Sequence, residues 1–136
     1  MKKKSGRLPK DFIRINVNPE GNEVDDCAVR AIAYASGKSW YEVFDLLCIK
    51  GRAMVCMPND MKACIALMEE FGFVKQTIAH TKRGGKRKTV RDLAKECTKP
   101  AVVRAAHHLV AIDGQGHYVD IWDCGSKTAY TYWTLG

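Results

Sequence analysis

Three residues that could act together on an acyl group are far apart in the sequence. Cys27 lies where a helix is expected to begin, His108 where a strand is expected to begin, and Asp123 where the next strand is expected to end. A thiol becomes an effective nucleophile when a neighbouring base takes its proton and a third group orients that base. The first turn of a helix also lowers the pKa of a cysteine. These residue types in this order predict a Cys27–His108–Asp123 triad that forms an acyl-enzyme intermediate.

Two neighbouring residues are alternatives for these roles. His107 is an alternative base, and Asp120 is an alternative carboxylate. Side chains alternate between the two faces of a strand, so His107 is expected to point away from His108. For the same reason, Asp120 is expected to point away from Asp123.

The pairing of two strands decides which carboxylate lies near His108. A glycine-containing turn after Ile112 is expected to join the two strands as a hairpin. We assume that Ile112 pairs with His117. His108 then lies opposite Ile121, and Asp123 is its diagonal neighbour on the same face. This register favours Asp123 as the partner of the imidazole.

The hydrophobic pattern predicts the elements that hold these residues. Apolar residues recur at helical spacing from Asp25 or Asp26, either of which could cap the helix, to Gly37, where the helix is expected to end. Ser39 and Glu42 form a capping box that predicts a second helix. Further helices are expected over residues 58–72 and 89–97, and strands over residues 101–105, 108–112, 118–122 and 128–133.

The order of these elements predicts the fold class and the domain organisation. Helices followed by antiparallel strands indicate an α+β fold. A chain of 136 residues suits a single domain over residues 1–136. Within it, residues 1–17 are expected to form a basic N-terminal arm, in which residues 13–17 are either a short strand or extended. Residues 18–133 are expected to form the core.

Composition argues against several other functions. The six cysteines lack the CxxC spacing typical of zinc sites and are expected to be free thiols. The chain has neither a phosphate loop nor a dinucleotide-binding fingerprint, so no cofactor is expected. No apolar segment approaches the roughly 20 residues that span a bilayer. We therefore expect a soluble, cytoplasmic protein that binds neither a metal nor a membrane.

Much of the net charge of +7 lies at the N-terminus and in one glycine-containing stretch. Exposed cations of this kind either remain solvated or bind nucleic acid or an acidic partner. We favour a solvated loop and keep the contact surface as the alternative. The cations of the stretch are Lys82, Arg83, Lys86, Arg87 and Lys88.

Three segments resemble parts of the papain-like cysteine peptidases. Residues 26–33, which begin with Asp-Cys-x-x-Arg-Ala, resemble the start of their nucleophile helix. Residues 108–114 resemble their histidine strand, and residues 118–125 resemble the strand that ends in their third triad residue. The chain is most similar to the branch that processes bacteriocin leader peptides. It also resembles small phage-encoded proteins that share a Met-Pro-Asn turn, here residues 57–59, and this likeness covers most of residues 18–133.

The resemblance implies a papain-like fold and a role for each site residue. Cys27 would attack an acyl carbon, His108 would transfer the proton, and Asp123 would hold the imidazole in its productive tautomer. Papain-like enzymes have a Gln shortly before the nucleophile that completes the oxyanion hole. This chain has no Gln there, and Asn22 is the residue that could supply an amide instead.

The expected function is a thiol-dependent hydrolase or acyl transferase that acts on an amide, peptide or isopeptide bond of a protein or peptide substrate. The alternative is a catalytically inactive papain-like binding protein of phage origin. Such a protein would engage a host protein or nucleic acid through the basic stretch. For a phage-encoded protein, the expected location is the cytoplasm of the host cell.

Overall fold

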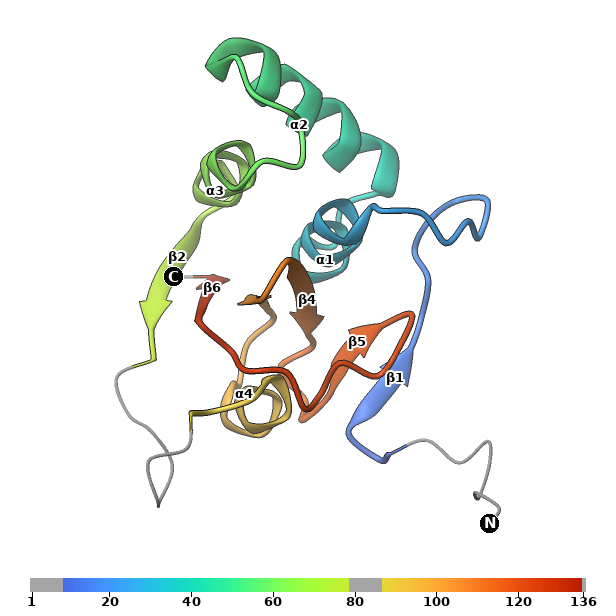
Figure 1. Ribbon diagram of the computed structural model, residues 1–136, viewed down its shortest axis with the longest axis vertical. Helices are drawn as coiled ribbons and strands as arrows, with labels where there is room; N and C mark the ends of the chain where they lie inside the picture. Colours follow the sequence, from blue (N-terminus) through green and yellow to red (C-terminus); the bar gives the residue numbers. More distant parts are fainter. Residues whose placement is uncertain (1–8, 79–86, 136) are drawn as a thin grey trace.

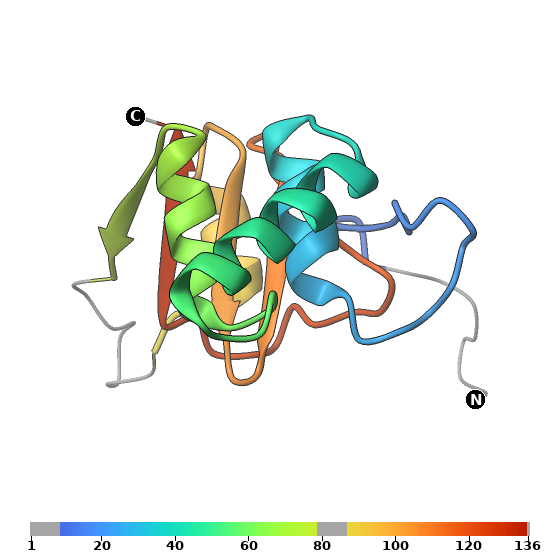
Figure 2. The same cartoon turned by 90° about the horizontal axis from the view of Figure 1, so that it is seen from above.

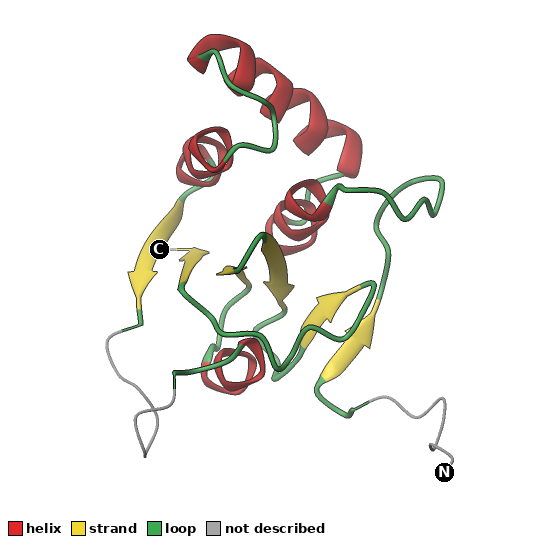
Figure 3. Cartoon of the chain, viewed as in Figure 1, coloured by secondary structure: helices red, strands yellow, loops and turns green. Residues whose placement is uncertain are grey.

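A mixed sheet between two layers of helices forms the fold. In a computed structural model that describes residues 9–78 and 87–135, three helices cover one face of the sheet and a fourth covers the other (Figure 1, Figure 3). The helices are α1 (Cys27–Ser36), α2 (Trp40–Met54), α3 (Met61–Glu70) and α4 (Val90–Glu96). The strands are β1 (Phe12–Arg14), β2 (Phe73–Thr77), β3 (Ala101–Ala105), β4 (His108–Ile112), β5 (Tyr118–Asp120) and β6 (Thr131–Leu135). None of the helices in these ranges has both the length and the apolar character needed to cross a membrane.

The six strands are arranged in the order β1-β5-β4-β3-β6-β2. β1 runs parallel to β5, and the other neighbouring strands are antiparallel. The predicted α+β class is confirmed, but the sheet is mixed and is not confined to the C-terminal half. β1 precedes all the helices and β2 lies between α3 and α4. Both are edge strands that pair with distant segments. β1 overlaps residues 13–17, which were expected to be a short strand or extended, whereas β2 was not predicted.

Local signals predict most of the other elements correctly. α1 ends at Gly37, which adopts a left-handed conformation (φ 77°). The side chain of Ser39 caps α2 by accepting the backbone N–H of Glu42 at 3.0 Å. β3 and β4 coincide with the predicted strands, whereas β5 ends earlier than expected, at Asp120. Part of the predicted N-terminal arm belongs to the core, because Phe12 of β1 is buried.

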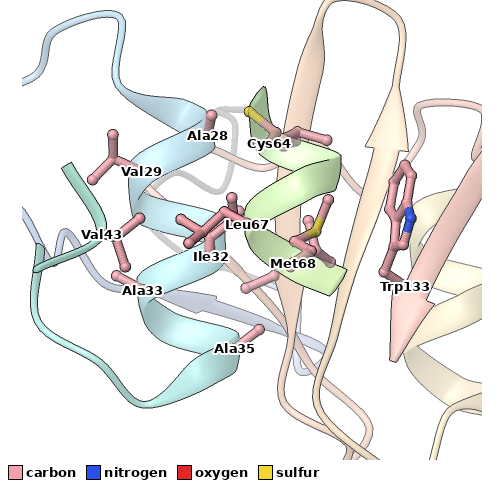
Figure 4. Packing of buried hydrophobic residues seen from close by; sticks show 14 of the residues in the cluster. Ala28, Val29, Ile32, Ala33, Ala35, Val43, Cys64, Leu67, Met68 and Trp133 are labelled. Atoms are coloured by element: carbon pink, nitrogen blue, oxygen red, sulfur yellow. The ribbon is translucent and has the colours of Figure 1, made fainter. Parts of the chain in front are cut away.

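Apolar side chains fill the space on both sides of the sheet. Figure 4 shows Ile32 of α1 and Leu67 of α3 packed against each other, with Met68 facing Trp133 of β6. On the opposite face, Leu93 of α4 packs in a second cluster. α2 packs against α1 and α3 (Figure 2), and its buried residues Val43 and Leu47 belong to the first cluster. Because α1 packs along β4, the start of the helix is held close to the start of the strand.

The hairpin between β4 and β5 has a different register from the expected one. Ile112 pairs with Tyr118 and not with His117. The backbone N–H of Asp113 donates to the carbonyl of His117 at 3.0 Å, and the Asp113 side chain accepts the backbone N–H of His117 at 3.1 Å. Gly114 permits this wider turn with a φ of 78°. A shift of one residue presents the opposite set of β5 side chains to β4.

Gly51 allows the chain after α2 to fold back against that helix. A Cβ at this position would lie 2.7 Å from the carbonyl oxygen of Cys56 and 3.1 Å from the nitrogen of Pro58. We expect Gly51→Ala to lower the free energy of unfolding by about 1–3 kcal/mol because of this overpacking. The gain in helix propensity, up to about 1 kcal/mol, opposes the loss.

Urea unfolding measures this effect. Arg52→Ala, at the neighbouring exposed position, is the matched control and should change stability by less than about 0.5 kcal/mol. A Gly51→Ala protein as stable as the wild type would show that the turn has room for a methyl group.

Candidate active site

The structure brings Cys27, His108 and Asp120 together. They are the first residue of α1, the first residue of β4 and the last residue of β5. Nε2 of His108 lies 2.5 Å from Oδ2 of Asp120. The Cys27 thiol lies near enough to the His108 side chain and to the backbone of Leu109 for both groups to lower its pKa. Since Nε2 faces Asp120, Nδ1 is the imidazole nitrogen available to the sulfur. The groups therefore follow one another as thiol, imidazole and carboxylate.

Asp123, which was expected to be the partner of His108, lies elsewhere. Its Oδ1 accepts the hydroxyl of Tyr118 at 2.5 Å and lies 3.6 Å from Nη2 of Arg91. The register of the hairpin explains the change. If the observed pairing of β4 with β5 is extended by one residue, Asp120 lies opposite Val110. Val110 is two positions after His108, so the two side chains are on the same face of β4 and Asp120 is the diagonal neighbour of His108.

The carboxylate of Asp120 is buried and is surrounded by donors. Oδ2 faces Nε2 of His108 and accepts the Cys124 thiol at 3.3 Å. Oδ1 accepts Nη1 of Arg30 and the backbone N–H of Ile121, both at 2.7 Å. Burial alone would raise the pKa of Asp120, but these hydrogen bonds and the charge of His108 outweigh it, so its pKa is lowered. Asp120 is therefore ionised although it is only 2% exposed.

Arg30 connects this carboxylate to the start of α1. Besides Asp120, it binds Oδ1 of Asp26 through Nε at 2.7 Å. The Asp26 carboxylate also accepts Nδ2 of Asn18 at 3.1 Å and Nε1 of Trp40 at 3.0 Å. Asp26 is the N-cap residue of α1 by position. Because its carboxylate is bound to these other partners, its side chain makes no capping hydrogen bond. The backbone N–H groups beside the nucleophile are left without that cap.

The pKa values of the thiol and the imidazole move in opposite directions. Burial raises the pKa of Cys27, but hydrogen bonds to His108 and to the backbone of Leu109, with the charges of His108 and Arg30, outweigh it, so its pKa is lowered. Burial lowers the pKa of His108, but its hydrogen bonds to Asp120, Cys124 and Cys27 raise that pKa to about 11. A lowered thiol pKa beside a raised imidazole pKa describes a thiolate–imidazolium pair.

Trp122 shields the imidazole. Its ring centroid lies 5.0 Å from that of His108 with the planes tilted by 40°, and the His108 side chain is only 8% exposed. Exclusion of water strengthens the hydrogen bond between His108 and Asp120, because the local dielectric constant is lower. The ring therefore helps to hold the imidazole in one orientation.

The sulfur opens into a cleft of about 260 Å³. One wall comes from the start of α1 and the turn that precedes α3, and the other comes from the turn between β3 and β4. Cys27 is partly exposed in it. The other residues of the walls are Asp25, Ala28, Asn59, Met61, Arg104, Ala105, His107, His108 and Leu109.

Two further residues named from the sequence take other positions or roles. Asn22 is held in a turn, where its backbone N–H donates to Oδ1 of Asn18 at 3.2 Å, and it is not among the described residues that line the cleft. The amide-bearing residue that does line the cleft is Asn59. His107 also lines the cleft and has a left-handed backbone (φ 52°), but His108 is the histidine that lowers the pKa of the Cys27 thiol.

A second hollow, of about 370 Å³, lies next to the cleft. The two share Asp25, Ala28 and Asn59 as lining residues. Its other walls are mostly apolar, and we call it the apolar groove. They consist of Val24, Asp26, Val29, Trp40, Phe44, Leu47, Met57 and Pro58. An elongated molecule seated in the apolar groove would therefore reach the sulfur.

His108, Asp120 and Cys124 also form a group of potential metal ligands. Within the described ranges they are the one such group found, with ligand atoms inside 4.8 Å of one another. Burial raises the pKa of Cys124, so its thiol is neutral and donates to Asp120. The atoms that would bind a metal thus already bind one another. Sequence spacing could not reveal this group, because it joins residues from separate strands and a loop.

The basic stretch is described only in part. Arg87 lies over the ring of Tyr130, 5.3 Å from its centroid. Nζ of Lys88 pairs with Glu96 at 2.8 Å. The remaining cations of the stretch, Lys82, Arg83 and Lys86, lie outside the described residues.

Arg30, Trp122 and Asn59 were not recognised from the sequence as site residues. Asp26 and Arg30 do carry a signal, because an acidic residue four positions before a basic one favours an ion pair on a helix. No local pattern shows that the same arginine reaches Asp120. Trp122 and Asn59 acquire their roles only from the folding of their segments around the cleft.

Comparisons of this chain with known protein families, with curated protein sequences and with solved structures found no match. Its function is therefore inferred from the geometry of this site.

Proposed function

We propose that this chain is a thiol-dependent hydrolase or acyl transferase of papain-like organisation, acting on an amide, peptide or isopeptide bond. One observation carries the proposal. A single imidazole, that of His108, lies between a thiol at a helix start, whose pKa it lowers, and a buried, ionised carboxylate, to which it is hydrogen-bonded. The nucleophile is Cys27 and the orienting carboxylate is Asp120.

In the first half of the reaction, the Cys27 thiolate attacks the carbonyl carbon of the substrate and a C–S bond forms. His108 is the general acid: its imidazolium gives a proton to the departing nitrogen as the C–N bond breaks. The amine leaves, and an acyl group remains on the sulfur as a thioester. Asp120 stabilises the imidazolium while it exists and holds Nε2 in place.

In the second half, His108 takes a proton from water or from an acceptor amine. The resulting nucleophile attacks the thioester carbon, the C–S bond breaks, and the thiolate–imidazolium pair is restored. Water produces a carboxylic acid, so the protein is then a hydrolase. An amine produces a new amide, so the protein is then an acyl transferase.

The tetrahedral intermediates need donors for their oxyanion. The first backbone N–H groups of a helix have no partner within it, and in α1 the Asp26 side chain does not cap them. We assign the backbone N–H of Cys27 as one donor. Asn59 lines the same cleft, and its amide is the proposed second donor in place of the absent Gln.

The apolar groove supports a polypeptide substrate. It adjoins the cleft and has Trp40, Phe44 and Met57 in its walls. Phe44 and Met57 are exposed at 39% and 70%, and covering them removes apolar surface from water. A peptide with an apolar side chain in the groove would place its backbone next to Cys27.

Selective alkylation tests the proposal. At about pH 6 an ordinary thiol is almost entirely protonated, so iodoacetamide should label Cys27 at least about tenfold faster than such a thiol. The rate should fall only as the pH drops through the lowered pKa of Cys27. Burial raises the pKa of Cys64 to about 12 and also raises the pKa of Cys97 and Cys124. Peptide mass mapping identifies the labelled site.

His108→Ala should abolish this rapid labelling at mildly acidic pH. His107→Ala, which removes the neighbouring imidazole, should have a much smaller effect. Slow and uniform labelling of all thiols in the wild type would refute the enzyme and favour the inactive papain-like binding protein.

A further inference from the structure

The wall of the cleft formed by β3 continues outward into a basic and aromatic surface. Arg104 lines the cleft, and its carbonyl accepts the backbone N–H of Tyr130 at 2.8 Å. The guanidinium of Arg87 lies 5.3 Å from the centroid of the Tyr130 ring. The backbone contact thus holds Tyr130, and with it Arg87, next to Arg104.

A second set of contacts starts at the imidazole. The ring of Trp122 contacts that of His108, and Nζ of Lys127 lies 5.7 Å from the Trp122 centroid. Lys127 and Tyr130 belong to the same segment between β5 and β6. The first set thus begins at a residue that lines the cleft, and the second begins at the imidazole. We call the five residues Arg87, Arg104, Trp122, Lys127 and Tyr130 the basic rim.

The basic rim is available to a ligand. Trp122 and Tyr130 are 42% and 45% exposed. Within the described residues, Arg87, Arg104 and Lys127 have no ion pair with a carboxylate. Arg87 and Lys127 are attracted to the faces of these rings, and their N–H groups can still donate hydrogen bonds to an anion. Among the described residues, the rim thus presents three positive charges without a carboxylate partner, and one of them, that of Arg104, lines the cleft that contains Cys27.

We propose that the basic rim binds an acidic stretch of the polypeptide substrate, next to the bond that Cys27 attacks. This inference rests on the proposed function, because it names the substrate class of the same site. Cationic side chains bind carboxylates through charge-assisted hydrogen bonds. The thiol acts on an acyl carbon, which a polypeptide backbone contains and a nucleic acid backbone does not. A polypeptide is therefore the occupant, with acidic residues over the rim.

Binding of a short oligo-glutamate peptide tests this inference. The protein is the full chain with Cys27→Ser, so that no acylation occurs. The rim variant carries Arg87→Gln, Arg104→Gln and Lys127→Gln. It should bind oligo-glutamate roughly tenfold more weakly, since each exposed ion pair contributes about a factor of two. An oligo-glutamine peptide of the same length should bind weakly to every variant.

A second triple variant controls for total charge. Arg52→Gln, Lys75→Gln and Lys95→Gln remove the same charge from exposed positions on other elements, and the affinity for oligo-glutamate should change by less than about twofold. Equal losses in the two triple variants would overturn the inference, because net charge would then explain the binding. A single-stranded oligonucleotide that binds the rim more tightly than oligo-glutamate would overturn it in favour of nucleic acid.

The binding of oligo-glutamate and the alkylation of Cys27 test the two proposals independently of each other. An unreactive Cys27 with selective binding of oligo-glutamate would refute the enzyme and leave the rim as a binding surface. A reactive Cys27 without selective binding would refute the rim and leave the enzyme.

Discussion

Asp120→Asn is expected to reduce the turnover of an activated ester by roughly 1,000-fold or more, a loss typical of a triad that lacks its carboxylate. The carboxylate favours the charged imidazole, and its Oδ2 fixes the position of Nε2 on His108. An amide in its place removes the charge and offers a donor to a nitrogen that is itself a donor. The pKa of His108 should fall, the pKa of Cys27 should rise, and both steps of acyl transfer should slow.

Release of nitrophenol from nitrophenyl acetate measures the effect, with circular dichroism to confirm that the variant is folded. Asp123→Asn is the matched control, since that carboxylate lies with Tyr118 and Arg91. Asp123→Asn should alter turnover by no more than about twofold, because among the described residues Asp123 shares no hydrogen-bond partner with Asp120. If Asp123→Asn were as damaging as Asp120→Asn, the assignment of Asp120 as the orienting residue would be wrong.

Arg30→Met is expected to lower the free energy of unfolding by about 3–5 kcal/mol, the usual cost of removing one partner from a buried ion pair. Arg30 is 7% exposed and binds the carboxylates of Asp26 and Asp120, both at 2.7 Å. Without the guanidinium, two buried carboxylates face each other across the space it occupied. The methionine fills much of the volume but supplies neither charge nor donors.

Urea unfolding of three variants tests whether the stranded carboxylates cause the loss of stability. Arg30→Met combined with Asp26→Asn should recover part of the lost stability, because one of the stranded charges is then absent. Lys50→Met removes one partner of an ion pair with the half-exposed Glu70 and should cost less than about 1 kcal/mol. A similar cost for Arg30→Met and Lys50→Met would show that the buried network contributes little to stability.

The helices illustrate what local sequence can predict. Gly37 ends α1 and Ser39 caps α2 as expected, because these signals act over a few residues of backbone. The same kind of reasoning failed for Asp26. Its side chain could cap the helix, but the folded chain offers it Arg30 and Trp40 instead. A capping preference is local, whereas the competing partners come from packing.

The edge strands and the oxyanion donor show where local prediction stops. β1 pairs with β5 and β2 pairs with β6, both far away in the sequence, and β2 was not predicted. Asn59 approaches the cleft because the chain after α2 folds back to begin α3. Asn22 is nearer to Cys27 in the sequence, yet its turn holds it outside the cleft walls. Distance along the chain is thus a poor guide to the composition of the site.

From the sequence alone, the residue types and most local elements follow: a cysteine at the start of α1 and a histidine at the start of β4. The choice between Asp120 and Asp123 was made by the tertiary structure. Side chains alternate along a strand, so the one-residue difference in the turn at Asp113 exchanged one carboxylate for the other. That turn depends on hydrogen bonds and glycine conformations that strand periodicity does not encode. The bridging position of Arg30 likewise arises only when α1 packs beside the sheet.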